Sequence, residues 1–352
     1  MKKSRAVPRL ALAASAAAIA LTVAACGGND NSDNGNAAKS GAGSDKVTKL
    51  SFQTFPQTMG TIPIKVAQEQ GIFEKNGLDV SVSDGTAGPT MVAALASGKV
   101  DAVGIPMFVG MQSVQAGAKI KALVGLIGGG GSVVFVSERV PKSDAPYPES
   151  AKALDGRTAA ISAPGGFSEK MLKRYVDGAS ASLTYATLPG VAPEVAAMKA
   201  GKVDVVNFDL ASSYPFVKQG IGHVFWDFQT TGPDEVRGAT TNEAWVSDKF
   251  LEENPEAAEA FARSIAQADA WIKDPANRAQ VGKYFSEIAG GQVADEDLDP
   301  MIEAIKPALG EKDVEVYNGF LDEGAEPLTA STLLAPMAPQ DETAAEQLAE
   351  ES

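Results

Sequence analysis

AALASGKVDAVGIP (residues 93–106) and AAMKAGKVDVVNFD (residues 196–209) are two copies of one pattern, far apart in the chain. In each copy a helical stretch ends at a glycine, Gly98 or Gly201, and an apolar strand follows the aspartate. Glycine often ends an α-helix, because it adopts left-handed backbone angles without strain. The repeat therefore predicts two equivalent helix-to-strand junctions, and with them two halves of similar architecture.

The segments around the two copies occur in the same order. Strand-like and helix-like patterns alternate at 47–54, 61–77, 78–83, 88–98 and 100–105, and again at 154–162, 167–178, 182–188, 193–201 and 203–208. Such alternation is typical of an α/β fold and predicts two lobes. A common turn that occurs twice by chance is the alternative, and the matched order argues against it. An apolar helical stripe at 254–274 predicts a long helix, followed by two more, packed on the first lobe.

The N-terminus has the pattern of an export signal. Four basic residues precede a short apolar run at 10–23, and small residues lead to Cys26. So short a run with basic flanks is typical of a signal peptide rather than a membrane span. The small residues before the cysteine resemble a lipobox, in which the cysteine is acylated. An ordinary signal peptide with an incidental cysteine is the alternative. We expect residues 1–25 to be removed and Cys26 to anchor the protein, extracytoplasmically, to the cell membrane.

Both ends of the mature chain are poor in large apolar residues. Residues 26–45 are rich in Gly, Asn, Ser and Asp, a composition that predicts a flexible tether. Residues 326–352 form an acidic tail, and 335–352 are expected to be frayed or disordered. The remaining body is long enough for two modest lobes.

Net charge and residue usage exclude several classes of partner. The formal net charge is −15, and removal of the four basic residues of the leader lowers it to −19. This charge argues against nucleic acid or anionic lipid as the main partner. One cysteine and one histidine, His223, argue against a disulfide framework and against a zinc or iron site. We expect no metal and no cofactor.

Open α/β sheets bind ligands beyond the carboxyl ends of their strands, where loops and helix starts converge. The segments predicted there are 55–61, 84–90 and 106–108 in the first lobe, and 162–168, 189–193 and 209–214 in the second. They are rich in Gly, Ser, Thr and Pro, contain no Lys or Arg, and carry four aromatic residues, Phe55, Phe108, Phe167 and Tyr214. The aromatic side chains either contact a ligand or pack between the lobes, and the sequence leaves both possibilities open.

These residues suit non-covalent capture better than catalysis. His223 lies away from the segments, so no Ser–His–acid set forms, and no glycine-rich loop carries the lysine of a phosphate site. The GGGG run at 128–131 is better interpreted as a flexible crossover. Asp84 and Asp209 are conceivable as an acid and a base, but an acid at a strand end is more often a helix cap or a lobe contact. We expect no enzymatic activity.

Several stretches resemble the periplasmic binding proteins of ABC importers, in the branch that includes nitrate, sulfonate, taurine and thiamine-precursor binding proteins. They are IPIKVAQEQGIFEKNGLDVSV, GPTMVAALASGKVDAVGI, SLTYATLPGVAPEVAAMKAGKVDVV and FLEENPEAAEAFARSIAQADAWI. The similarity extends from about Leu50 to Gly324. Its most specific part is Ala67, Gly71, Phe73, Glu74, Lys75, Gly77 and Leu78.

This resemblance implies a type II periplasmic-binding-protein fold, with two α/β lobes, two crossovers near 127–133 and 235–241, and a ligand between the lobes. Lobe 1 is then 46–130 plus 237–325, and lobe 2 is 131–236. It also implies a monomer that binds a small-molecule solute and delivers it to an ABC permease and its ATPase. The ligand residues carried over by position are Gln53, Phe55, Gln57, Thr61, Gly85, Thr86, Gly88, Thr90, Pro106, Phe108, Ser162, Gly165, Gly166, Phe167, Ser168, Pro189, Gly190, Asn207, Asp209 and Tyr214.

The chain departs from the family pattern in ways that leave the ligand open. Asn207-Phe208-Asp209 stands where many members have a Trp-Glu-Pro-like sequence, so the contact from the second lobe differs. Without Lys or Arg in the loops, a sulfonate- or nitrate-like anion would depend on helix starts and hydroxyls. A neutral or aromatic, pyrimidine-type ligand fits equally well. A thiamine-precursor-type enzyme is one alternative, though the chain lacks the His and the Cys-rich segment of such relatives. A sensing lipoprotein that works without a transporter is the other alternative.

Overall fold

The structure is a computed structural model that describes residues 47–129, 132–188 and 190–351. The predicted leader, Cys26 and the tether at 26–45 lie outside the described residues, and so does Pro189. Within the described ranges, none of the helices combines the length and the apolar character needed to cross a membrane.

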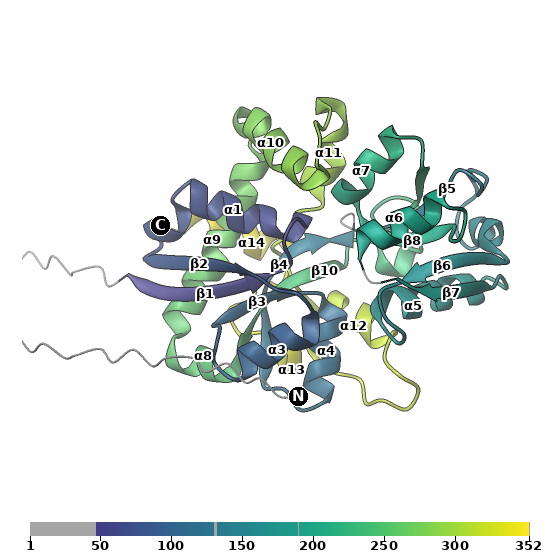
Figure 1. The fold of residues 1–352 in the computed structure, drawn as a ribbon. Coiled ribbons are helices and arrows are strands. Elements are labelled where there is room, and N and C mark those ends of the chain that lie inside the picture. The colour runs from purple at the N-terminus through teal and green to yellow at the C-terminus, as the bar shows by residue number, and fades with distance from the viewer. Residues whose placement is uncertain (1–46, 130–131, 189, 352) are drawn as a thin grey trace, which may run out of the picture. The chain divides into compact units, whose positions relative to one another are not determined.

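Five strands form sheet 1, in the order β2-β1-β3-β10-β4 (Figure 1). Strand β1 is parallel to β2 and β3, and β10 runs antiparallel between β3 and β4. Because of this direction, the start of β10 lies at the carboxyl end of β3, with Glu243 opposite Ile105. The strands are β1 (Thr48–Thr54), β2 (Leu78–Asp84), β3 (Ala102–Ile105), β4 (Ile120–Gly128) and β10 (Thr240–Ser247).

Five further strands form sheet 2, in the order β7-β6-β8-β5-β9. Strand β6 is parallel to β7 and β8, and β5 runs antiparallel between β8 and β9. Sheet 2 therefore repeats the arrangement of sheet 1, and the predicted α/β duplication is confirmed. The strands are β5 (Ser132–Ser137), β6 (Arg157–Ile161), β7 (Leu183–Thr187), β8 (Val205–Asp209) and β9 (Gly222–Asp227).

Helices cover both faces of sheet 1 (Figure 1). One face carries α1 (Ile62–Glu69), α2 (Ile72–Lys75), α9 (Pro255–Lys273) and α14 (Glu342–Glu350). The other carries α3 (Gly88–Ala96), α4 (Met107–Gln115), α12 (Glu311–Asn318) and α13 (Ala330–Leu333). The short α8 (Asp248–Glu253) precedes α9, and α10 (Arg278–Ala289) and α11 (Asp299–Glu303) follow it. The predicted stripe of α9 is buried, and Phe261 stacks on Phe52 with ring centroids 5.6 Å apart.

Three helices follow strands of sheet 2. They are α5 (Phe167–Leu172), which continues into a π-helical turn at Lys173–Asp177, α6 (Val191–Lys199) and α7 (Leu210–Lys218). On α6, Val195 and Met198 pack in one apolar cluster with Val206 and Phe208 of β8. Helix α6 thereby covers one face of sheet 2, and its first turn stands at the carboxyl edge of the parallel strands.

The repeated junction has the same geometry in both halves. Gly98 follows α3 with φ of 70°, and Gly201 follows α6 with φ of 71°. Behind each glycine, the N–H of the next lysine donates across the helix end, from Lys99 to Ala94 O (2.9 Å) and from Lys202 to Ala197 O (2.9 Å). These bonds are those of a Schellman motif. The prediction that both glycines end a helix is confirmed.

The aspartate of each junction ties its strand to a neighbour. Asp101 Oδ2 accepts from the backbone N–H (2.8 Å) and the hydroxyl (2.7 Å) of Ser51 on β1. Asp204 Oδ1 accepts from the Ser137 hydroxyl (2.9 Å) and from Arg139 Nε (2.9 Å). Both carboxylates lie at the amino ends of parallel strands, so the repeated motif is structural.

Two expectations about the chain ends and helices are wrong. Residues 335–351 are not frayed: Ala335 and Ala345 are buried, and α14 packs against α9, where Gln267 Nε2 donates to Glu351 O (3.0 Å). The predicted helix 61–77 is two helices, because Gly71 adopts left-handed angles (φ 66°) and breaks it.

Candidate functional site

The predicted ligand segments of the two sheets meet at a pair of aromatic rings. Phe108 of α4 follows β3, Phe167 opens α5 after β6, and their ring centroids lie 5.9 Å apart. Phe167 also packs on Tyr317 (5.6 Å) and on Phe320 (5.5 Å). Phe108 is buried by this packing. The structure therefore shows these aromatic residues in contact between the two halves, and any contact with a ligand stays a prediction.

The segment after β1 uses much of its hydrogen-bonding capacity internally. The Thr61 hydroxyl donates to Thr58 O (2.7 Å), so it does not cap α1 as a helix-capping acceptor. Gln53 Nε2 donates to Asp84 O (3.2 Å), which ties β1 to the end of β2. These predicted ligand residues shape the edge of the sheet in the structure.

Gln57 is the exposed residue of this segment with an unusual backbone. Its φ of 54° lies in the left-handed region, which side chains other than glycine rarely adopt. Such conformations persist where the surroundings enforce them, and they often occur at binding sites. Phe55, two residues earlier, is half-buried against the core that also contains Phe108.

Two glycines of the next segment are required by packing. A Cβ on Gly85 would lie 2.3 Å from Met91 Sδ, and one on Gly88 would lie 2.7 Å from Val109 Cγ1. A side chain at either position would force the neighbouring Met91 or Val109 side chain to shift. The remaining predicted residues of this side are exposed or half-buried and free to face a ligand: Thr86, Thr90 and Pro106.

On sheet 2, Asn207 joins three elements. Its Nδ2 donates to Ser132 Oγ (3.0 Å) and to Val133 O (3.0 Å), and its Oδ1 accepts from the Ser168 hydroxyl (3.3 Å). Strands β8 and β5 and helix α5 are thereby held together at the carboxyl edge. The predicted residues Asn207 and Ser168 are thus brought into direct contact.

The glycine segment before α5 is folded around a carboxylate. Gly165 N–H donates to Glu169 Oε2 (2.6 Å), and Gly166 N–H donates to Ala163 O (3.2 Å). The ion pair with Lys173, followed by the Gly165 bond, lowers the pKa of Glu169. These two N–H groups are therefore occupied within the segment itself. Ser162 and Gly190 are exposed.

Asp209 and Tyr214 have defined structural partners. Asp209 caps α7, accepting from Ser212 N–H (2.8 Å) and from its hydroxyl (2.6 Å), and burial raises its pKa. The Tyr214 hydroxyl donates to Asp297 Oδ2 (2.9 Å) and accepts from Ala294 N–H (3.1 Å). Asp209 is therefore a helix cap, which is the alternative to a catalytic role that the sequence offered. Tyr214 links α7 to the segment after α10.

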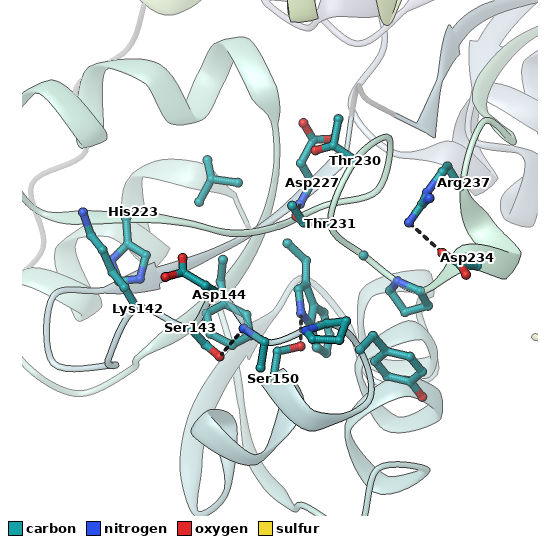
Figure 2. A pocket seen from close by; sticks show the side chains of 18 of the residues that line it. Lys142, Ser143, Asp144, Ser150, His223, Asp227, Thr230, Thr231, Asp234 and Arg237 are labelled. Atoms are coloured by element: carbon teal, nitrogen blue, oxygen red, sulfur yellow. Dashed lines mark hydrogen bonds and ion pairs between the residues drawn. The ribbon is translucent and has the colours of Figure 1, made fainter.

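A cavity of about 940 Å³ lies beside β9 (Figure 2). It is lined by 142–147, Ser150, 223–227, 230–235 and Arg237, and by none of the predicted ligand residues. His223 faces it with neither ring nitrogen hydrogen-bonded among the described residues, and burial lowers its pKa. Arg237 in the lining is already paired with Asp234 at 2.6 Å. We therefore place the candidate site at the carboxyl edges and not here.

Comparison with known proteins identifies the family. Residues 44–286 match the NMT1-like family. The chain belongs to the NMT1-like family. A comparison with curated protein sequences finds no significant match.

Solved structures with the same fold are numerous. The alkanesulfonate-binding protein SsuA from Xanthomonas axonopodis pv. citri, bound to MOPS, is 15% identical, with 81% of this chain and 97% of that chain covered and a TM-score of 0.62. The aliphatic sulphonate-binding protein SsuA from Escherichia coli is 18% identical (77% and 89% covered, TM-score 0.61). The nitrate-binding protein NrtA from Synechocystis PCC 6803 is 19% identical (72% and 69%, TM-score 0.53). The predicted family and periplasmic-binding-protein fold are confirmed.

Two buried carboxyl groups of this NMT1-like protein escaped the sequence prediction. Glu194, in the first turn of α6, is 5% exposed, and Glu243 of β10 is fully buried. Burial raises the pKa of Glu194 to about 7, and burial, followed by the nearby Asp313 carboxylate, raises that of Glu243. Both stand at the carboxyl edge of a sheet. In sequence, Glu194 was a typical acid at a helix start, and only burial distinguishes it.

Asn242, next to Glu243, is a further residue that the sequence did not indicate. Its Oδ1 is buried and has no hydrogen-bond partner among the described residues. It lies beside the predicted segment 55–61, 3.3 Å from where a Cβ on Gly60 would stand. Asn242 is therefore a candidate ligand residue from β10.

The described residues contain no group of three or more His, Cys, Asp or Glu side chains arranged to hold a metal ion. The carboxyl edges offer hydroxyls, amides and acids, which suit hydrogen bonding to a small molecule.

Proposed function

We propose that this NMT1-like protein is the solute-binding component of an ABC importer. It captures a small solute between the carboxyl edges of the two sheets and delivers it to a permease and its ATPase. The observation that carries the proposal is the contact of Phe108 with Phe167, 5.9 Å apart, because it brings the predicted ligand segments of two duplicated sheets face to face. Family membership and the binding proteins named above support it.

The proposed lobes are 46–130 plus 237–325 and 131–236. Their support is that sheet 1 draws its strands from 48–128 and 240–247, whereas sheet 2 draws them from 132–227. Two crossovers between lobes permit hinge closure around a ligand. The proposed ligand residues are those predicted from the sequence, with Glu194 and Asn242 added.

The proposed anchor is a lipid on Cys26, which holds a monomer at the extracytoplasmic face of the membrane. Labelling cells with a fatty-acid analogue tests it: the wild-type protein is expected to be labelled and membrane-bound, and the Cys26→Ser variant unlabelled. Labelling of the serine variant would contradict this part of the proposal.

A thermal-shift screen tests solute binding itself. A ligand at 100 times its Kd raises the stability by about 2.7 kcal/mol, and small-angle scattering is expected to show closure on binding. The compared proteins, named for alkanesulfonate and nitrate, make these anions the first compounds to test, beside aromatic and pyrimidine-type solutes. Uptake of the identified solute by cells that lack the gene then separates transport from sensing: unchanged uptake would reject the transport role.

A further inference from the structure

Glu194 is a buried residue whose carboxyl group has no hydrogen-bond or ion-pair partner among the described residues. Its residue is 5% exposed, and among the described residues no hydrogen-bond donor and no opposite charge acts on its carboxyl group, so burial alone displaces its pKa. A buried carboxylate without a partner is costly, and proteins keep few of them outside functional sites.

The helix places this carboxyl at the ligand edge. Helix α6 buries Glu194, Val195 and Met198, which share its inner face. Val195 and Met198 pack against β8 of sheet 2. Glu194 lies one turn before Met198, near the start of α6, and the start of α6 follows the carboxyl end of β7. Figure 1 shows α6 beside β8. The acid therefore stands over the carboxyl edge of the parallel strands.

The candidate site contains acids but no free base. The segments 53–61, 84–90, 105–108, 162–168, 190–194 and 207–214 include Asp84, Glu194 and Asp209 and no Lys, Arg or His. Glu243 adds a fourth carboxyl at the same edge of sheet 1. With a formal net charge of −15 for the whole chain, both the local and the global charge favour a positive ligand group.

Among the described residues, several ammonium groups lie beside these segments, and each has a partner. Lys173 is paired with Glu169, and Lys306, whose charge acts on Glu243, donates to Gly238 O. Lys170 Nζ stands 5.4 Å from the centroid of the Phe108 ring and is bonded to Asp322. Lys218 Nζ stands 4.9 Å from the Tyr214 centroid and 3.3 Å from Asp297 Oδ2.

The helix starts have lost much of their capacity to bind anions. A proline removes one N–H donor from the first turns of α1, α3 and α6, at Pro63, Pro89 and Pro193. At the starts of α5 and α7 an internal carboxylate already accepts an N–H, from Gly165 and from Ser212. Helix starts bind anions through free N–H groups, so each of these five offers at least one donor fewer to an anion.

We propose that the solute carries a cationic nitrogen group with N–H donors, an amine or amidinium, and that this group pairs with the Glu194 carboxylate. The inference rests on the proposed solute-binding function and names the chemical class of its ligand. On binding, the cation favours the ionised carboxylate, so the protein releases a proton near neutral pH and binds more weakly as the pH falls.

The first experiment compares probes that differ in charge. Benzylamine, agmatine and 4-aminopyridine are tested by thermal shift and calorimetry beside benzenesulfonate, ethanesulfonate and nitrate, and the protein is also incubated with a bacterial small-molecule extract, washed, and analysed by native mass spectrometry. Binding confined to amines or amidines, or capture of such a compound, is the expected result. Binding confined to anions overturns the cation assignment and leaves the solute-binding function intact. No response to any probe and no captured molecule rejects the function, and the inference with it.

The second experiment tests Glu194. The Glu194→Gln variant is expected to keep its circular dichroism spectrum and to lose at least ten-fold in affinity for the cationic probe that binds. Its proton release, measured by calorimetry in buffers of different ionisation enthalpy, is expected to vanish. Glu256→Gln, which changes an exposed acid after a proline in the first turn of α9, is the matched control and is expected to behave as wild type. Unchanged affinity and proton release in Glu194→Gln would overturn the assignment.

Discussion

The Tyr214 hydroxyl donates a 2.9 Å hydrogen bond to Asp297 Oδ2, and the two residues belong to different halves of the chain. Tyr214 lies in α7, after β8 of sheet 2, and Asp297 lies between α10 and α11, beyond the helix that covers sheet 1. Ala294 N–H donates to the same hydroxyl (3.1 Å). One phenol group therefore joins the two halves through two hydrogen bonds.

Tyr214→Phe removes this connection and keeps the aromatic ring. We expect a loss of about 1 kcal/mol in unfolding free energy, typical of a hydrogen bond, and a larger radius of gyration of the ligand-free protein in small-angle scattering. Tyr284→Phe is the matched control, because the Tyr284 hydroxyl bonds to Glu69 (2.7 Å) within one half. It is expected to lose similar stability with an unchanged radius. Equal radii for both variants would contradict a connection of the two halves through the Tyr214 hydroxyl.

Glu194 gives the ligand-free protein a specific pH dependence. Its pKa is raised from 4.5 to about 7 by burial, so the folded state binds the proton more tightly than the unfolded state between these values. The contribution to stability is full below pH 4.5, is lost as the pH rises through 7, and stays lost above it. The Glu194→Gln variant has no titrating carboxyl group at this position, so its unfolding free energy does not fall in this way as the pH rises. Chemical denaturation should find the variant about 3 kcal/mol more stable than wild type at pH 8 and nearly equal at pH 4; equal stability at pH 8 would disprove the burial effect.

Replacing either junction glycine by alanine is expected to cost the same amount of unfolding free energy. Gly98→Ala and Gly201→Ala each place a Cβ in the left-handed region, and neither Cβ would meet an atom closer than 3.8 Å. The backbone alone then sets the penalty, about 1 kcal/mol at each site. Gly291→Ala, where φ is not left-handed and nothing lies within 4 Å, is the control and is expected to be neutral. A difference of more than 1 kcal/mol between the two junctions, in urea denaturation, would show that they are not equivalent.

The C-terminal helix is expected to stabilise the first half. Ending the chain after Gln340 removes α14, its buried Ala345, and the bonds of Glu351 to Arg263 (3.2 Å) and Gln267 (3.0 Å) on α9. We expect a loss of about 2 kcal/mol from the exposed apolar surface. Burial, mainly, raises the pKa of Asp269 on α9 to about 6, with added repulsion from α14, so truncation should lower that pKa in an NMR titration. An unchanged melting temperature would contradict a structural role.

The duplicated framework was predictable because its signals are local. A glycine that ends a helix, followed by an apolar strand, has the same form in any context, and Gly98 and Gly201 both keep it. Strand β10 was missed because it returns to sheet 1 from the far side of the second half, and its neighbours in the sheet are distant in sequence. The tail was misjudged because its small alanines are buried by elements distant in sequence: α14 with Ala345 packs on α9, and Ala335 N–H donates to Ala122 O of β4 (2.8 Å).

The sequence predicts the candidate site as a set of segments, and it does not predict the contacts that their side chains make. Position after a predicted strand gave 162–168 and 209–214, the family resemblance added Asn207, and the structure brings Ser168 and Asn207 together. The sequence did not reveal that Glu169 occupies the Gly165 amide, or that Glu194 is buried without a partner among the described residues. Both facts depend on which way a side chain turns once the helix is packed, and composition carries no such information.

The repeated junction also provides two equivalent labelling positions from which the motion of the two halves can be measured. Lys99 and Lys202 are exposed, occupy the same position in two copies of one motif, and lie at the ends of their strands opposite the candidate site. The chain has a single native cysteine, Cys26, so in a version that starts after it, cysteines at these two positions would accept a donor and an acceptor dye without touching the solute. Energy transfer between them would then report the approach of the two halves one molecule at a time.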